Sequence, residues 1–259
     1  MFFYYNNMLY LYYNKSVVMF LMKIKIIGTG SIWTNLNSAC YLIDDEIMID
    51  FPNGACKYLY REKIIPSSIN YILLTHFHGD HYFDIPFYIL NKAKSDNKKC
   101  IIFCSKDGKS KIKRLGKLAF PNSFNNSLKE INIKYNYNYN FNINNYKVDK
   151  LLVEHGRMKP SFGYIFNDNN KYIGFTGDTC LCSNVELMAQ KCCYLFCDCM
   201  LLIGNNKHQG INDLEYLSKK YPECIFVVSH LENETKEKLK TKKIKNIKIL
   251  EDGSVIKIN

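Results

Sequence analysis

Arginine is scarce in this sequence, with only Arg61, Arg114 and Arg157 among 259 residues. The formal net charge of +11 therefore comes almost entirely from lysine. Excess positive charge attracts phosphates and anionic surfaces, but the chain is also rich in Asn, Ile and Tyr, as proteins encoded by AT-rich genomes are. The basic stretches 106–117 and 236–248 fit solvated helix surfaces at least as well as a binding patch. The charge alone therefore does not indicate a nucleic-acid-binding protein.

Long apolar runs are also missing. The uninterrupted apolar stretches near the N-terminus, 8–13 and 17–22, are far shorter than the ~20 residues that a membrane helix needs. This region does not resemble a signal peptide either, because a signal peptide carries its positive charge before the apolar core. We therefore predict no membrane partner, an N-terminal appendage over residues 1–21, and a functional domain over residues 22–259.

The cysteines do not indicate a disulfide framework. There are eleven of them, an odd number, and Cys192 and Cys193 are adjacent, which suits a disulfide-bonded secreted domain poorly. The cluster between Cys180 and Cys199 matches no zinc-finger spacing. We interpret these thiols as small buried apolar side chains in a protein of the reducing cytoplasm.

A glycine-rich nucleotide loop is absent, because Gly28-Thr29-Gly30 alone is too weak a signal for one. Alternating apolar residues predict a strand over 23–27 and a longer one over 194–201, and strands followed by helices recur in both halves. Asn212 with Glu215 resembles the capping box of a helix over 214–220. Two β-rich halves with helices on one side each predict an α/β fold with four layers, an αββα sandwich.

Three histidines and an aspartate lie within six residues in the segment 76–81, directly after an apolar strand. Alternate residues at a strand end project to the same side. His76 and His78 are therefore able to reach one ion, while Asp80 and His81, on the turn, reach another. Imidazole nitrogens and carboxylate oxygens suit zinc and similar ions. A lone histidine would fit a polar surface loop, but this spacing predicts a site for two metal ions.

The segment 76–81 resembles the signature of the metallo-β-lactamase superfamily, whose members carry further ligands downstream in a fixed order. That order is an isolated His, an Asp beside Gly at a strand end, and a final His at a strand end. The chain offers His155, Asp178 and His230 in these places, so five of its six histidines match ligand positions. The resemblance spans about residue 22 to the C-terminus.

The resemblance implies two divalent ions bridged by Asp178, with zinc as the first choice and manganese or iron as alternatives. By the same resemblance, one ion is assigned to His76, His78 and His155, and the other to Asp80, His81 and His230. Asp50 matches an Asp that binds no metal itself and orients the loop of ligands. A role of Asp50 in forming a turn at a strand end is an equal alternative. Gly28 and Gly30 match a turn beside the site, where a simple tight turn is favoured over substrate contact.

The sixth histidine, His208, lies where ribonuclease Z-like members of the superfamily carry a proton-donating His. The resemblance therefore implies Asp80 and His208 as catalytic residues, and a solvent-facing loop His is the alternative for His208. Ribonuclease Z itself carries a long tRNA-gripping arm between the ligands that correspond to His155 and Asp178. Here only residues 156–177 separate them, so tRNA 3′-end processing fits less well.

The sequence thus predicts a dinuclear metal-dependent phosphodiesterase that acts on a small phosphodiester, such as a cyclic nucleotide or a nucleic-acid end. A hydrolase of esters, thioesters or lactones is the alternative, since it would use the same metals. A tRNA 3′-end endonuclease and a non-enzymatic binding protein are less favoured, because no ligand position is empty. Larger nucleic acids are allowed as partners but not required, and a homodimer is left open.

Overall fold

The computed structural model describes residues 2–5, 8–13, 16–18 and 22–258, and two seven-stranded sheets dominate them. The strands of the first sheet are β4 Met22–Gly28, β5 Cys40–Ile43, β6 Ile47–Ile49, β7 Tyr71–Leu73, β8 Lys99–Phe103, β9 Asn132–Asn136 and β17 Val255–Ile258. Those of the second sheet are β10 Asn140–Ile143, β11 Tyr146–His155, β12 Met158–Asp168, β13 Lys171–Phe175, β14 Tyr194–Asp198, β15 Ile225–Ser229 and β16 Ile247–Ile249.

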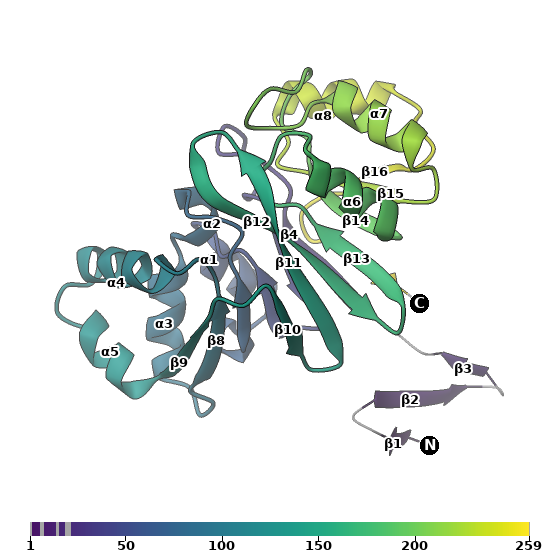
Figure 1. Ribbon diagram of the computed structural model, residues 1–259. Coiled ribbons are helices and arrows are strands. Elements are labelled where there is room, and N and C mark those ends of the chain that lie inside the picture. The colour runs from purple at the N-terminus through teal and green to yellow at the C-terminus, as the bar shows by residue number, and fades with distance from the viewer. Residues whose placement is uncertain (1, 6–7, 14–15, 19–21, 259) are drawn as a thin grey trace.

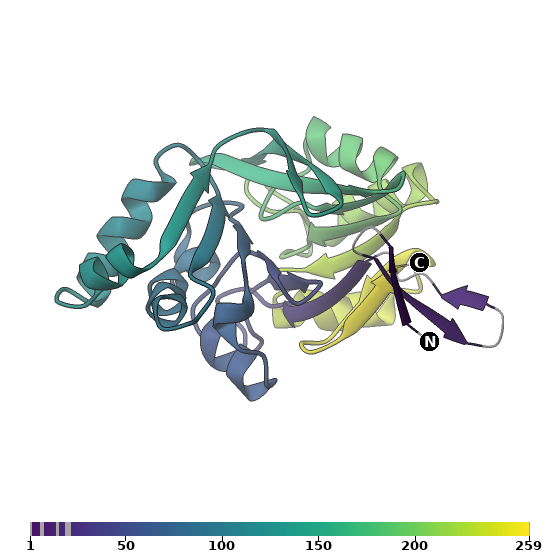
Figure 2. The ribbon, with the colours of Figure 1, turned by 90° about the horizontal axis from the view of Figure 1, so that it is seen from below.

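The two sheets have the same internal plan. In the first, β4, β5 and β6 pair antiparallel, and β6 to β9 then pair parallel. In the second, β10 to β13 pair antiparallel, and β13 to β16 pair parallel. The last strand, β17, returns to the first sheet beside β4. In Figure 2 the teal and green strands of the second sheet pass above the purple and blue strands of the first.

Helices fill the crossovers between the parallel strands and cover the outer faces of the sheets. The first half contains α1 Ala55–Arg61, the 3₁₀ helix η1 Pro66–Ser68, α2 Gly79–Tyr82, α3 Ile85–Ala93, α4 Gly108–Ala119 and α5 Phe124–Glu130. The second half contains α6 Ser183–Lys191, α7 Ile211–Lys220 and α8 Asn233–Thr241. Figure 1 shows the two groups of helices on opposite sides of the paired sheets. Among the residues that the structure describes, no helix combines the length and the apolar character that crossing a membrane requires.

Three apolar clusters hold the four layers together. Successive strand residues face opposite sides of a sheet, so Ile72 of β7 packs in the cluster under the helices and Leu73 packs between the sheets. In the same way, Val227 of β15 points between the sheets and Val228 points to the cluster under the helices of the second half. The predicted αββα sandwich is therefore confirmed.

Two details of the sequence-based prediction are wrong. The strand predicted over 194–201 ends at Asp198, because the Asp198 carboxylate accepts a hydrogen bond from the Met200 amide at 3.0 Å and turns the chain. Helix α7 begins at Ile211, so Gly210 and not Asn212 is its N-cap, and the Asp213 carboxylate accepts the Gly210 amide at 3.0 Å. Asn212 instead accepts a hydrogen bond from the Gly204 amide at 2.8 Å.

Two other expectations concern the cysteines and the N-terminus. All eleven cysteines are free thiols and most are buried in the apolar clusters, as small apolar side chains would be. The predicted appendage over residues 1–21 lies partly outside the described residues. Its described strands, β1 Phe2–Tyr5, β2 Met8–Tyr13 and β3 Ser16–Val18, form a sheet of their own. Its separation from the functional domain over residues 22–259 stays a prediction.

Candidate metal centre

The residues predicted to bind metal all lie at the carboxyl ends of strands or just after them. The segment 76–81 follows β7, His155 ends β11, Asp178 follows β13 and His230 follows β15. The first sheet thus contributes one loop, and the second sheet contributes three separate strand ends. Residues that lie far apart in the sequence therefore meet at one edge of the sandwich.

The first group of donor atoms comes from His76, His78, His155 and Asp178, whose ligand atoms all lie within 4.8 Å of one another. The Nδ1 atom of His78 lies 3.0 Å from Nε2 of His76 and 3.1 Å from Nε2 of His155. Three imidazole nitrogens at such distances face one common point, as the ligands of a single ion do.

The second group comes from Asp80, His81, Asp178 and His230, again with all ligand atoms within 4.8 Å. The Oδ2 atom of Asp178 lies 3.3 Å from Nε2 of His81 and 3.1 Å from Nε2 of His230. Asp178 belongs to both groups. The structure therefore brings together all seven residues that the sequence assigned to two ions, in the same two sets and with the same shared aspartate.

Two of the ligand imidazoles, His155 and His81, are oriented by hydrogen bonds through their Nδ1 atoms. The Nδ1–H group of His155 donates to the Lys207 carbonyl oxygen over 2.8 Å, because a carbonyl oxygen only accepts. Its Nε2 atom then carries a lone pair that is free for an ion. His81 is oriented in the same manner, with Nδ1 lying 2.8 Å from the Asp50 carboxylate.

Asp50 connects this support to the metal loop. It is buried, it has a positive φ of 61°, and its carboxylate accepts hydrogen bonds from the amide of Thr75 at 2.8 Å and from its hydroxyl at 2.7 Å. The same carboxylate reaches His81. Asp50 therefore turns the chain and also orients the loop, so both of the functions that its place in the sequence suggested are present.

Gly28 and Gly30 allow close packing behind the site. A Cβ atom on Gly28 would lie 2.1 Å from the Ser38 carbonyl oxygen, so no larger residue fits without moving the backbone. Gly30 pairs with Leu231, which directly follows the ligand residue His230. Gly28 thus allows the end of β4 to pack against Ser38, and Gly30 connects the following turn to the chain next to His230.

The electrostatics of the cluster fit divalent cations. Burial lowers the pKa of His76, His78 and His155, which favours the neutral form that binds metal. Burial also opposes a charge on His230, but the nearby carboxylates, Asp178 foremost, outweigh it and raise the pKa to about 9. The buried Nε2 atoms of His81 and His230 have no hydrogen-bond partner. The carboxylates of the second group thus attract positive charge, and a cation that displaces the imidazole protons would satisfy both the carboxylates and these nitrogens.

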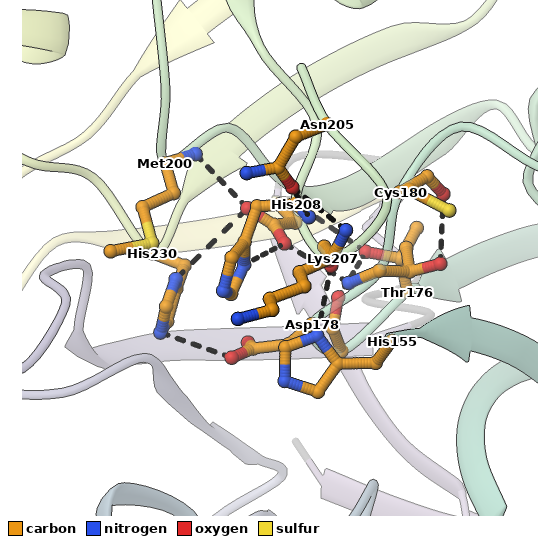
Figure 3. Close-up of polar contacts among 12 residues, drawn as sticks. His155, Thr176, Asp178, Cys180, Met200, Asn205, Lys207, His208 and His230 are labelled. Carbon is orange, nitrogen blue, oxygen red and sulfur yellow. Dashed lines mark hydrogen bonds and ion pairs between the residues drawn. The ribbon is translucent and has the colours of Figure 1, made fainter. Parts of the chain in front are cut away.

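Asp198 also belongs to the site, although no pattern in the sequence indicated it. Its Oδ2 atom lies 2.8 Å from Nδ1 of His208, and the two residues form a third close group with His230. The His208 ring stacks on the His230 ring with centroids 5.0 Å apart, and it lies 4.7 Å from the His155 ring (Figure 3). His208 therefore faces the cluster and not the solvent. The missed signal was an aspartate at a strand end, hidden because the strand was predicted to continue to Leu201.

A groove of about 880 Å³ opens beside the first group of ligands. Two of the candidate metal ligands, His78 and His155, line this groove. Three cationic side chains and one acidic one also line it, namely Arg157, Lys159, Lys207 and Glu154. A substrate in this groove would therefore meet the candidate metal ligands and a net positive lining together.

Comparison with known proteins identifies the chain's family. Residues 22–256 match the family described as anti-Pycsar protein Apyc1. This chain belongs to that family. Ribonuclease Z of Pyrococcus horikoshii is 28% identical over 158 residues, which cover 58% of this chain and 50% of that protein. The chain thus spans about half the length of the curated relatives it matches.

Solved structures show the same fold as this member of the Apyc1 family. The metallo-β-lactamase fold protein YhfI of Bacillus subtilis has a TM-score of 0.74 at 16% identity and covers 92% of this chain and 99% of its own. A diphosphatase of the PhnP family has a TM-score of 0.73 at 15% identity and covers 92% and 98%. The predicted resemblance to the ribonuclease Z-like branch of the metallo-β-lactamase fold is confirmed.

Proposed function

We propose that this chain is a dinuclear metal-dependent hydrolase that cleaves a small phosphodiester, such as a cyclic nucleotide or a nucleic-acid end. One observation carries the proposal: two groups of N/O donors share Asp178, and the Asp198–His208 pair lies directly beside them. Zinc is the first choice of metal, because imidazole and carboxylate ligands suit it, and manganese and iron are alternatives. The names of the related proteins, a ribonuclease and a diphosphatase, agree with chemistry at phosphorus.

When bound, two divalent ions supply Lewis acidity and a water molecule that is nucleophilic near neutral pH. The chain's own residues supply positioning and proton transfer. Asp80 belongs to the second group of donors, its Oδ2 atom lies 3.5 Å from Nε2 of His230, and it is partly exposed. A carboxylate that combines a ligand position with access to solvent would accept the proton that the attacking water loses. Asp80 thus serves as a ligand and as a catalytic residue.

His208 supplies the second proton transfer. The Nδ1–H group of His208 donates to the Asp198 carboxylate, so a second proton, taken up from solvent, lies on Nε2. The imidazolium then donates this Nε2 proton to the departing oxygen and returns to the neutral form. Asp198 is fixed in turn by the amides of Thr179 and Met200, each 3.0 Å from its carboxylate oxygens. Asp198 is therefore a positioning residue, and His208 is the general acid.

The chain segment between His155 and Asp178 favours a small substrate. The 22-residue segment between His155 and Asp178 contains β12 and β13, which are joined by a tight turn at Asn169 and Asn170. No arm extends from this segment to grip a folded tRNA. A small phosphodiester therefore suits the groove better than a pre-tRNA does.

Metal analysis coupled to substrate profiling tests the proposal. Purified protein should contain about two equivalents of zinc, manganese or iron per chain. It should hydrolyse bis-p-nitrophenyl phosphate and at least one 2′,3′- or 3′,5′-cyclic nucleotide faster than a lactone or a pre-tRNA. Faster turnover of the lactone would instead support the ester-hydrolase alternative, and cleavage of pre-tRNA would support 3′-end processing.

A further inference from the structure

Lys207 lines the groove, and its backbone also orients the candidate metal ligand His155. Lys207 lies in the loop between β14 and α7, and its carbonyl oxygen accepts the His155 Nδ1–H over 2.8 Å. The neighbouring carbonyl, of Asn206, accepts the Gly156 amide at 3.0 Å. Two hydrogen bonds thus tie this loop to the hairpin that follows His155. The position of the Lys207 backbone relative to the ligands is therefore fixed.

The side chain of Lys207 is directed by Gly156. Gly156 has a positive φ of 55°, and a Cβ atom on it would lie 2.8 Å from Cγ of Lys207. The aliphatic stem of Lys207 therefore lies over the bare backbone of Gly156 and leads the ammonium group into the groove. Figure 3 shows this side chain on the same side of the loop as the His208 ring.

The Lys207 ammonium group has no fixed counter-charge. Within the part of the chain that the structure describes, no carboxylate forms an ion pair with it, and the side chain is exposed. Arg157 and Lys159 line the same groove, against the single acidic residue Glu154. An ammonium group that is held near the ligands and lacks an anionic partner attracts a substrate anion.

We propose that Lys207 binds the non-bridging phosphate oxygens of the substrate and thereby selects an anionic phosphodiester over a neutral ester. This inference rests on the proposed function. A phosphodiester carries one negative charge shared by two oxygens, whereas a carboxylic ester carries none. The ammonium group offers N–H donors to those oxygens. Since His208 is the next residue, one short loop supplies both the charge that holds the substrate and the proton for its leaving group.

The decisive comparison uses two substrates with the same leaving group, bis-p-nitrophenyl phosphate and p-nitrophenyl acetate. In metal-loaded Lys207→Gln, KM for the phosphodiester should rise by about 10- to 100-fold, as expected for the loss of a charge-assisted hydrogen bond. The kinetics with the acetate should be unchanged, and metal content should stay the same. Lys207→Arg should restore most of the phosphodiester affinity. The matched control is Lys113→Gln, which removes an exposed lysine from α4.

Binding of inorganic phosphate gives a second measurement that does not depend on turnover. Calorimetric titration should show phosphate affinity about tenfold weaker in Lys207→Gln than in the parent or in Lys113→Gln, and the difference should shrink as salt is added. Unchanged phosphate affinity together with an unchanged KM would overturn the assignment, as would equal losses on both esters. If the parent protein cleaves p-nitrophenyl acetate but no phosphodiester, the proposed function fails, while the phosphate titration still decides the role of Lys207.

Discussion

The ligand cluster and the groove beside it are built in opposite ways. The cluster is largely buried, and His76, His81, Asp178 and His230 are all at most 4% exposed. The groove is formed by exposed side chains of the hairpin at Arg157 to Lys159 and of the loop that contains Lys207. The buried cluster carries the residues on which the proposed chemistry depends. The exposed side chains of the groove are able to change without disturbing those residues. We therefore expect the reaction class and the substrate choice to depend on different residues of this protein.

The strongest test of the cluster is removal of the residue that both groups share. Asp178→Ala should release at least one ion and lower turnover by more than about 10³-fold, beyond the 10- to 100-fold expected for residues behind the ligands. Metal content and phosphodiester turnover are the measurements. Asp96→Ala, which changes an exposed aspartate, is the matched control and should keep both. Full metal content and activity in Asp178→Ala would show that Asp178 does not bridge.

The sequence predicts the ligands of the buried cluster better than it predicts the residues around them. The ligands of the first loop lie within six residues, so their spacing alone indicated a metal site, and the four layers followed from the repeated order of strands and helices. Asp198 could not be found in this way, because its role depends on where β14 ends and on a contact with His208 across a loop. Lys207 is one exposed lysine among many in the sequence. Only its contacts with His155 and Gly156, some fifty residues away along the chain, single it out.

His208 lies between the two regions, and its removal should have the next largest effect. If His208 donates the proton to the leaving group, as proposed, His208→Ala should lower turnover by about 10² to 10⁴ for a poor leaving group. The loss should be much smaller for p-nitrophenolate, which departs without a proton. Metal content should not change. Equal losses on good and poor leaving groups, or loss of an ion, would refute the assigned role.

A substitution of Asp198 tests whether the residue that orients His208 matters for turnover as much as His208 itself. Asp198→Asn keeps the size of the side chain but removes the charge that holds Nδ1 of His208, so turnover of poor leaving groups should fall by about 10- to 100-fold. The double variant with His208→Ala should be no slower than His208→Ala alone, because both changes remove one function. Additive losses would mean that Asp198 acts independently of His208, for instance through His230, whose Nδ1 lies 4.0 Å away.

The smallest expected effect concerns Lys150, which tests whether burial by itself gives an ionisable group a function. Lys150 is 2% exposed, as buried as His81 or Asp178. Among the described residues, its ammonium donates only to the carbonyl oxygens of Cys104 and Tyr137, at 3.2 and 3.0 Å. Burial lowers its pKa to about 8. The adjacent Cys104 thiol stays neutral over the relevant range, because burial raises its pKa to about 12. Lys150 also lies over the ring of Phe162 and not beside a ligand.

Because the pKa of Lys150 is lower in the folded protein than the ordinary value of about 10.4, the unfolded chain binds more protons between these two values. The contribution of Lys150 to stability should therefore rise with pH from about 8 to 10, by at most ~1.4 kcal/mol per pH unit. Lys150→Met cannot titrate, so the difference in unfolding free energy between the parent and this variant should grow in favour of the parent over that range. Urea denaturation at several pH values measures it, with the exposed Lys113→Met as the control. The lost hydrogen bonds shift the unfolding free energy of the variant by the same amount at every pH. Equal pH dependence of the two unfolding free energies would therefore contradict the lowered pKa of Lys150. The expected pH dependence together with unchanged catalysis would show that Lys150 affects stability and not the reaction.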